Sequence, residues 1–192
     1  MAPETSGWLF LGLIRFVKSA MSEQHLKNLI ATVPEETQQR VFAEIIRPVT
    51  WYLYEDFAAS LRALDAIAGH DNGKTIKLLG IDGGKRMLDT IFSVYRSMSN
   101  PERFARSAPS TWSRMFRHAG HMEPIAWEPQ NTVWRIIDFP EMDPLHCLLH
   151  RGWLKGVLEN MGCALQKYPM ETKCTSKGNP YHEFVCRWTF NK

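Results

Sequence analysis

The residues best suited to chemistry in this sequence lie near its C-terminus, in the segment ETKCTSKGNPYHEFVCRW (residues 171–188). Cys174 lies four residues before Gly178, and His182 lies four residues after it. If Gly178 is the apex of a β-hairpin turn at 176–180, the thiol and the imidazole face each other across the ladder, with Cβ atoms about 5 Å apart. A thiol beside an imidazole is either half of a metal site or a packed pair.

Strand parity limits a metal site in this hairpin. Cys174 and His182 are expected on one face of the strands, whereas Glu171 is expected on the other face unless a β-bulge intervenes. Three interpretations of the pair follow: an unmetallated contact at a sheet edge, a structural zinc site, and a catalytic Cys–His dyad. The dyad lacks a visible third group that would orient the histidine.

The composition fits a soluble globular protein. The chain has 192 residues, of which 44% are hydrophobic and 22% are charged, values typical of a folded domain with a sizeable core. No run of about 18 apolar residues predicts a membrane span. The apolar stretch 8–14 is preceded by Glu4 and ended by Arg15, which does not match a secretory signal. We therefore expect reduced cysteines and a cytoplasmic location.

Charge along the chain is uneven. The net charge of +3 is too small to imply a polyanionic partner, so nucleic acid is not expected. Between Lys85 and His118, however, seven basic residues stand against two acidic ones. A solvated helical surface explains this stretch, and the alternative is a docking face for an acidic partner.

The pattern of elements predicts an α+β fold. We expect a helical N-terminal shell with helices at 8–20, 22–30, 34–46, 51–68, 75–98, 101–107 and 110–119, the last two separated at Pro109. The second half predicts a small antiparallel sheet and a C-terminal β-hairpin, with strands at 125–127, 132–139, 164–174 and 181–190 and a helix from Asp143-Pro144 to Met161. No linker is visible, so residues 1–192 are predicted to form a single domain.

Glycines at helical spacing predict a close helix contact. Gly152 and Gly156 lie one turn apart on one helix face, which permits another backbone to approach, either within the fold or across a dimer. The helix expected at 75–98 contains Gly80, Gly83 and Gly84, which allow close packing or mark a bend.

Three stretches of the sequence resemble a known superfamily. They are VTWYLY (49–54) leading into 57–64, HRGWLKG (150–156), and the hairpin order Cys174, Gly178, His182, Trp188. The superfamily holds the 4-vinyl-reductase-like small-molecule-binding domains, the haem–nitric-oxide (H-NOX) domains and the TRAPP tethering subunits. The chain is most similar in outline to uncharacterised bacterial single-domain members of about its own length.

The resemblance implies a zinc site in the hairpin. Phenol-sensing regulators with a vinyl-reductase-like domain carry a motif of the form E-x2-C-x7-C with a further cysteine upstream. Glu171-x2-Cys174-x7-His182 is similar, with histidine in the last place, and zinc accepts imidazole as well as thiolate. The upstream candidates are Cys147, His150 and Cys163. The predicted ligand set takes Cys163 as the fourth member.

The sequence disfavours haem. His118 and His121 are the histidines that could suggest an axial ligand. The haem-binding relatives use a Tyr-x-Ser-x-Arg triad, and the similar segment Tyr95-Arg96-Ser97-Met98-Ser99 lacks the final arginine.

The resemblance also implies a pocket for a small apolar or aromatic molecule between helices and sheet. Aromatic residues suit such a site because they combine apolar area with a polar handle. The predicted lining is Trp51, Tyr54, Phe57, Tyr95, Trp112, Phe116 and Trp153. The alternative is that these residues are ordinary core aromatics.

Three functions from different classes follow. The first is a non-catalytic sensor or carrier that binds a small apolar or aromatic ligand and signals through a partner protein. The second is a protein-interaction adaptor that acts as a homodimer, as in the TRAPP subunits. The third is an enzyme that uses Cys174 and His182. Fold resemblance alone does not choose among them.

Overall fold

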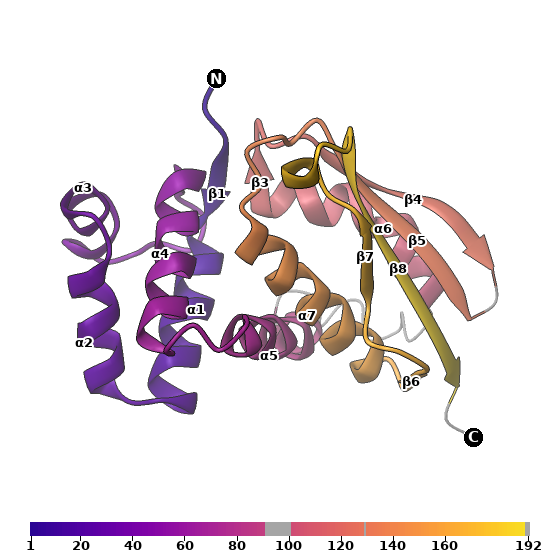
Figure 1. The fold of residues 1–192 in the computed structure, drawn as a ribbon, viewed down its shortest axis with the longest axis horizontal. Coiled ribbons are helices and arrows are strands. Elements are labelled where there is room, and N and C mark those ends of the chain that lie inside the picture. The colour runs from indigo at the N-terminus through magenta and orange to yellow at the C-terminus, as the bar shows by residue number, and fades with distance from the viewer. Residues whose placement is uncertain (91–100, 129, 191–192) are drawn as a thin grey trace. The chain divides into compact units, whose positions relative to one another are not determined.

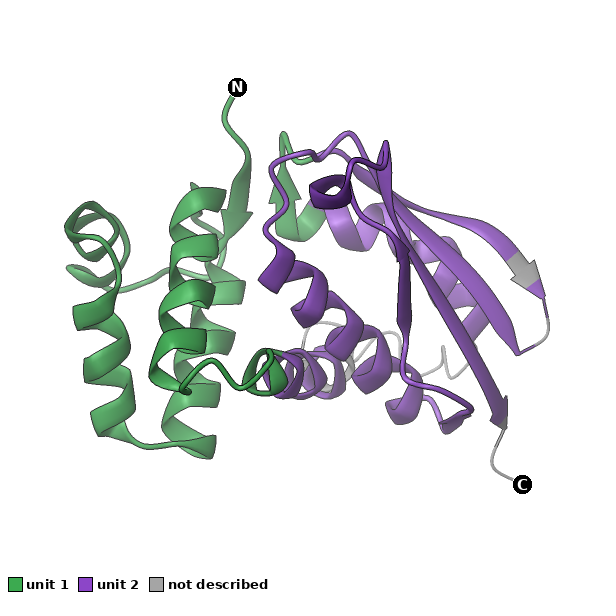
Figure 2. Cartoon of the chain, in the orientation of Figure 1, with its two compact units in different colours: residues 1–76, 114–119 green, residues 77–113, 120–192 purple. Residues whose placement is uncertain are grey.

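The protein is described by a computed structural model that covers residues 1–90, 101–128 and 130–190. The chain divides into two compact units, unit 1 with residues 1–76 and 114–119, and unit 2 with residues 77–113 and 120–192 (Figure 2). Each unit has its own helices and its own antiparallel sheet, so the predicted α+β class is confirmed. The single-domain organisation stays a prediction. In the described ranges, no helix has the length and apolar character needed to cross a membrane.

Unit 1 combines helices with a three-stranded sheet of order β2-β1-β3. Its elements are β1 (Glu4–Ser6), α1 (Gly7–Ala20), α2 (Glu23–Thr32), α3 (Glu35–Thr37), the π-helical turn η1 (Gln38–Phe42), β2 (Trp51–Leu53), α4 (Tyr54–Ile67) and β3 (Phe116–Arg117), with the ends of two longer helices. The helices largely match the prediction, but the prediction of helix at Trp51–Leu53 is wrong. Those residues pair with β1, and β1 also pairs with β3, contacts that helical periodicity cannot reveal.

A buried carboxylate organises the helices of unit 1. The side chain of Asp56 is 1% exposed. Its carboxylate oxygens accept hydrogen bonds from Arg40 Nη2 at 2.7 Å, from Arg40 Nε at 3.0 Å and from Thr37 Oγ1 at 2.7 Å. The bidentate guanidinium supplies the opposite charge that a buried carboxylate requires.

Unit 2 contains a five-stranded antiparallel sheet of order β4-β5-β8-β6, with β7 also paired to β8 (Figure 1). Its elements are most of α5 (Lys74–Thr90), most of α6 (Pro101–Met115), β4 (His121–Glu128), β5 (Asn131–Ile137), α7 (Pro144–Asn160), β6 (Cys163–Leu165), β7 (Met170–Lys173), the 3₁₀ turn η3 (Thr175–Lys177) and β8 (Tyr181–Phe190). The predicted helix at Asp143-Pro144 and the predicted final hairpin both form. The prediction of one strand over 164–174 is wrong, because residues 166–169 separate β6 from β7.

The prediction that Pro109 separates two helices is wrong, because α6 continues through it. Proline removes one backbone donor, which costs the helix a hydrogen bond. Buried residues on one side of α6, including Phe104, Ala108 and Trp112, hold the helix in place. Tertiary packing therefore overrides the local preference.

The core of unit 2 lies between the sheet and the two helices α6 and α7. Trp134 and Phe184, from β5 and β8, are fully buried. The Phe104 ring of α6 lies 6.1 Å from that of Trp134, and the His150 ring of α7 lies 4.7 Å from that of Phe184. Both helices therefore cover the same face of the sheet.

Glycines let α5 and α7 cross at close range. A Cβ on Gly84 would lie 2.4 Å from the carbonyl oxygen of Trp153, and one on Gly156 would lie 2.3 Å from that of Ile81. Real Cβ atoms do not approach backbone this closely, so these positions exclude larger residues. Of the two predicted uses of the Gly152–Gly156 face, the structure thus shows the contact within the fold.

Candidate metal centre

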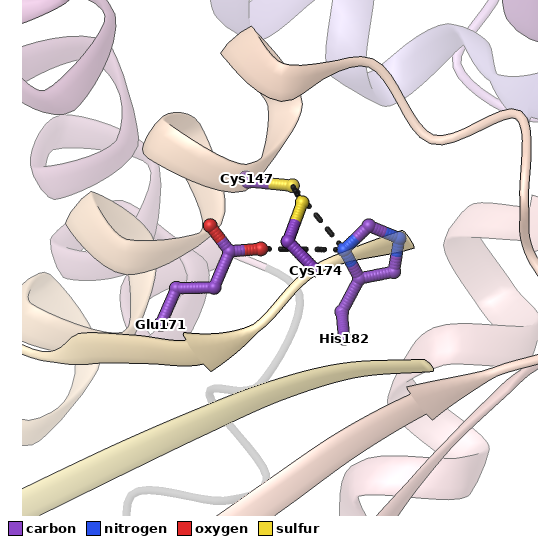
Figure 3. Close-up of side chains that lie close together, drawn as sticks. All are labelled: Cys147, Glu171, Cys174 and His182. Atoms are coloured by element: carbon purple, nitrogen blue, oxygen red, sulfur yellow. Dashed lines mark hydrogen bonds and ion pairs between the residues drawn. The ribbon is translucent and has the colours of Figure 1, made fainter. Parts of the chain in front are cut away.

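Four potential metal ligands meet in unit 2: Cys147, Glu171, Cys174 and His182 (Figure 3). One ligand atom from each residue lies within 4.8 Å of the other three. Cys147 Sγ is 3.9 Å from Cys174 Sγ and 3.4 Å from His182 Nδ1. His182 Nδ1 is also 3.3 Å from Glu171 Oε1. The two thiols, one imidazole and one carboxylate therefore face a common point.

Three of the six separations between these ligand atoms are close to the edges of a zinc tetrahedron. With Zn–S distances of about 2.3 Å and Zn–N and Zn–O distances of about 2.0–2.1 Å, a tetrahedral site places two sulfurs about 3.8 Å apart, sulfur and nitrogen about 3.5 Å apart, and nitrogen and oxygen about 3.3 Å apart. The corresponding separations here are 3.9, 3.4 and 3.3 Å. The donor types are also those that zinc takes in proteins.

Cys147 is placed by the start of α7. The Asp143 side chain accepts a hydrogen bond from Leu145 N at 2.8 Å, and Pro144 occupies the first turn. Cys147 N donates to Asp143 O at 3.2 Å, so Cys147 lies in the first helical turn. The N-terminal end of a helix favours negative charge, which suits a metal-bound thiolate.

Glu171 joins the site through a β-bulge. The register of β7 against β8 shifts between the pairs Glu171↔Phe184 and Lys173↔Glu183. The shift leaves Thr172 exposed and brings Glu171 to the same side as Cys174. The parity objection raised by regular strands is thereby removed, because a bulge changes which face a side chain occupies.

The turn after β7 fixes Cys174. Its carbonyl oxygen accepts hydrogen bonds from Lys177 N at 3.0 Å, from Asn179 N at 3.2 Å and from Asn179 Nδ2 at 3.2 Å. Gly178 has φ +80°, a conformation that favours glycine. The thiol also lies 3.0 Å from Ser176 Oγ, so the side chain has a partner besides the other ligand atoms.

His182 is held by the sheet and by a hydrogen bond from its ring. It is fully buried, and its backbone pairs with that of Ile136 on β5. Its Nδ1 faces the other three ligand atoms, while its Nε2 lies 2.9 Å from Thr175 Oγ1. Both ring nitrogens are thus occupied, and only Nδ1 is directed at the cluster.

The electrostatics of the cluster favour a bound cation. Burial raises the pKa of Cys147 well above its usual range, and the neighbouring charge of Glu171 raises it further. For Glu171, burial raises the pKa, but hydrogen bonds from His182, Cys147 and Cys174 outweigh it and the pKa is lowered. A largely shielded carboxylate beside two thiols would be stabilised by a metal dication, which displaces the thiol protons on binding.

The structure places the predicted fourth ligand elsewhere. Cys163 lies on β6, where its backbone pairs with that of Phe190 on β8. Phe190 is eight residues from His182 along the same strand, a distance of about 26 Å. Cys147 takes the fourth position instead. The spacing of Glu171, Cys174 and His182 identified three of the residues that meet, whereas Cys147 was one of three upstream candidates that the sequence could not separate.

The predicted pocket residues of unit 1 lie in its core or on its sheet. The Trp51 ring lies under Arg117, whose guanidinium carbon is 4.0 Å from the ring centroid. Tyr54 and Phe116 have ring centroids 6.5 Å apart, and Phe57 packs edge-on against another phenylalanine ring of the unit. These contacts are consistent with core aromatics, and a role in ligand binding stays a prediction.

The predicted pocket residues of unit 2 surround two buried histidines. The Trp112 ring stacks on His146 at 6.2 Å, and the Trp153 ring stacks on His150 at 5.4 Å. Tyr95 lies outside the described residues. Burial lowers the pKa of His146, and burial together with His182 lowers that of His150 to about 3. Both imidazoles are therefore neutral at ordinary pH.

Three of the basic residues between Lys85 and His118 form ion pairs within unit 2. The pairs are Lys85–Glu159, Arg86–Asp82 and Arg106–Glu102. Such exposed pairs are typical of a solvated helical surface. A docking role for this stretch, like a homodimer, stays a prediction.

Comparison with known proteins identifies the fold. No protein-family model and no curated protein matches the chain. Solved structures do match: a mutant H-NOX protein from S. oneidensis in the Fe(II) ligation state has a TM-score of 0.73 at 11% identity, covering 97% of both chains. An H-NOX protein from S. oneidensis in the Fe(II)NO ligation state gives 0.72 at 10% identity, covering 96% of this chain and 99% of that chain. The unliganded Fe(II) H-NOX protein from K. algicida gives 0.71 at 9% identity, covering 97% of both.

The chain therefore has an H-NOX-like fold, which confirms that part of the predicted resemblance. These structures do not test the predicted resemblance to the 4-vinyl-reductase-like domains and to the TRAPP subunits, which stays a prediction. The prediction that disfavoured haem is contradicted, because the similar structures are of haem–nitric-oxide domains described in Fe(II) and Fe(II)NO states. The triad argument behind that prediction rested on Tyr95 to Ser99, which lie outside the described residues.

The histidines that the sequence suggests for haem are exposed, whereas His146 and His150 are buried. His118 is exposed, and His121 is exposed with its Nε2 4.0 Å from Glu123. His146 and His150 are buried and neutral, and neutral imidazole is the form that binds metals. The Nε2 atom of His150 is buried without a hydrogen-bond partner in the described part of the chain. His150 thus offers an available nitrogen in an aromatic surrounding.

Proposed function

We propose that this protein is a non-catalytic sensor domain whose unit 2 is held together by a structural Zn²⁺ ion bound by Cys147, Glu171, Cys174 and His182. The observation that carries the metal site is the approach of these four ligand atoms to within 4.8 Å of one another. Four protein ligands fill a tetrahedral zinc site, which leaves no open position for water or substrate. A closed site of this kind supports a structural role rather than a catalytic one.

The ion would join two segments that are distant in sequence. Cys147 lies at the start of α7, and the other three ligands lie on or beside the hairpin formed by β7 and β8. With zinc bound, α7 would be fixed to the hairpin at one end, while the glycine contact fixes it to α5 further along. This arrangement gives a rigid frame on which a sensor can hold a guest molecule.

The sensor role is supported by the H-NOX-like fold, and the guest is the finer part of the proposal. A small apolar or aromatic molecule beside Trp112 and Trp153 is one candidate. Haem is the second, favoured by the unpartnered Nε2 of His150 in the described part of the chain. His150 would then supply the imidazole ligand, and bound haem would supply an iron centre for a gaseous ligand. Signalling would pass to a partner protein in the cytoplasm.

Metal analysis tests the zinc site. Protein purified without a histidine tag should contain about one equivalent of zinc by plasma emission, and the Cys147→Ser and Cys174→Ser variants should lose it. Cys163→Ser is the matched control, since Cys163 is equally buried but lies on β6. Zinc below about 0.2 equivalents in the wild-type protein, with none taken up on titration, would contradict the metal site.

Guest binding is tested separately. Native mass spectrometry should detect a co-purified small molecule, and haem titration should show whether a Soret band forms. If haem binds through His150, His150→Leu should abolish the band, whereas His121→Leu should not. A wild-type protein that carries no guest and forms no Soret band would contradict the sensor proposal without affecting the zinc result.

A further inference from the structure

We infer that Thr175 is a positioning residue that selects Nδ1 of His182 as the metal-binding nitrogen. The inference rests on the proposed zinc site and goes beyond it by assigning what fixes the ligand geometry. Thr175 follows Cys174 in the chain, and the hydrogen bond of its side chain is made to His182. Its hydroxyl lies 2.9 Å from His182 Nε2.

The assignment follows from the hydrogen-bonding capacity of imidazole. A neutral imidazole has one nitrogen that carries a proton and one that accepts. Nδ1 of His182 faces Cys147 Sγ and Glu171 Oε1, so a metal ion at the cluster would bind Nδ1 in its unprotonated form. The proton then resides on Nε2, which donates it to Thr175 Oγ1.

Thr175 is held in place without help from a metal. It begins the 3₁₀ turn η3, and its carbonyl oxygen accepts a hydrogen bond from Gly178 N at 2.9 Å. The preceding residue, Cys174, has its own carbonyl bonded to Lys177 N and Asn179 N. The turn therefore carries both a ligand, Cys174, and the hydroxyl that orients another ligand, His182.

The burial of His182 makes this hydroxyl important. His182 is fully buried, so without Thr175 Oγ1 the Nε2 proton has no nearby acceptor in the contacts described. A buried donor without an acceptor is costly, which favours the tautomer that protonates Nδ1 and removes it as a ligand. Outer groups that orient a metal-binding histidine typically change metal affinity by about 10- to 100-fold.

Three variants test the inference. Thr175→Val keeps the shape of the side chain and removes the hydroxyl, Thr175→Ser keeps the hydroxyl, and Thr189→Val removes a hydroxyl on β8 that bonds Ala164 O instead. Zinc dissociation constants are measured by competition with a chromophoric chelator. We expect about a 10- to 100-fold weaker affinity for Thr175→Val, and values within about threefold of wild type for the other two.

A spectroscopic readout separates positioning from general stability. In zinc-loaded wild-type protein, long-range ¹H–¹⁵N correlation spectra should show His182 protonated at Nε2 and metal-bound at Nδ1. Protonation at Nδ1 would overturn the inference even if Thr175→Val did not fold. Equal zinc affinities for Thr175→Val and Thr189→Val would also overturn it, while leaving the zinc site intact. A wild-type protein that takes up no zinc would instead overturn the proposed site itself.

Discussion

Each unit of this protein holds a carboxylate that is largely shielded from solvent, Asp56 in unit 1 and Glu171 in unit 2, and the two have different partners. In unit 1, Asp56 receives a bidentate guanidinium from Arg40 and a hydroxyl from Thr37. In unit 2, the groups that act on Glu171 are His182, Cys147 and Cys174. None of these three side chains carries a permanent positive charge, unlike the guanidinium of Arg40.

The two clusters differ in whether the chain itself supplies a permanent positive charge beside the carboxylate. Asp56 has its opposite charge within the chain, as a structural ion pair requires. Glu171 lies among groups that become anionic or remain neutral when they bind a cation, so in the proposed site a Zn²⁺ ion would supply the opposite charge. A shielded carboxylate does not by itself indicate a metal site. The further metal ligands beside Glu171 are what support the proposed one.

The largest expected effect comes from removing the metal. In a thousandfold excess of free zinc over its dissociation constant, bound zinc should add about 4 kcal/mol to the free energy of unfolding. Cys147→Ser should remove this increment and lower the melting temperature by about 10 °C. The measurement is thermal unfolding with added zinc and with a chelator.

Cys163→Ser provides the comparison for that prediction. It alters a buried cysteine, so it has a cost of its own, but its response to the chelator should equal that of the wild type. A chelator that leaves wild-type unfolding unchanged would show that unit 2 is as self-sufficient as unit 1.

The glycine contact of α7 should have the next largest effect. Gly84→Ala places a Cβ 2.4 Å from the Trp153 carbonyl oxygen, and such overpacking should destabilise the protein by about 3 kcal/mol. Gly83→Ala is the matched control, because its Cβ would meet nothing within 4 Å. That change should stabilise by about 0.5–1 kcal/mol through helix propensity. Urea unfolding measures both, and equal effects would contradict the close crossing of α5 and α7.

A smaller effect is expected in unit 1. Asp56→Asn keeps the shape of the side chain but replaces charge-assisted hydrogen bonds with neutral ones, which should cost about 2 kcal/mol. This loss should be the same with zinc and with a chelator, because the ion pair with Arg40 lies wholly within unit 1. If the cost of Asp56→Asn changed with zinc, the two clusters would be coupled and the contrast between them would fail.

The sequence anticipated those parts of the site that depend on local chemistry. Gly178 predicted the turn, Asp143-Pro144 predicted the start of α7, and the spacing of Glu171, Cys174 and His182 predicted three of the residues that meet. Each of these signals spans a few residues and reflects conformational or ligand preferences that act locally.

The remaining parts depend on contacts that no local pattern contains. Cys147 meets Cys174 across 27 positions, so its selection over Cys163 required the path of the chain between them. The bulge beside Thr172 emerges only when β7 is aligned with β8. Likewise, β1 pairs Glu4 with Arg117, and strands this short form only because their distant partners are present.

The smallest expected effect concerns pH and is confined to unit 2. Burial, with the charge of His182, lowers the pKa of His150 from 6.5 to about 3. Between these values the unfolded chain binds a proton that the folded protein does not, so the contribution is fully present above pH 6.5 and is lost as pH falls. We expect a loss of about 1 kcal/mol between pH 6.5 and about pH 5.5. His150→Leu should remove this contribution and leave the one from buried His146, whose pKa is also lowered. Urea unfolding is carried out with a chelator, so that metal release does not contribute. A slope unchanged by the substitution would mean that His150 takes up protons in the folded protein.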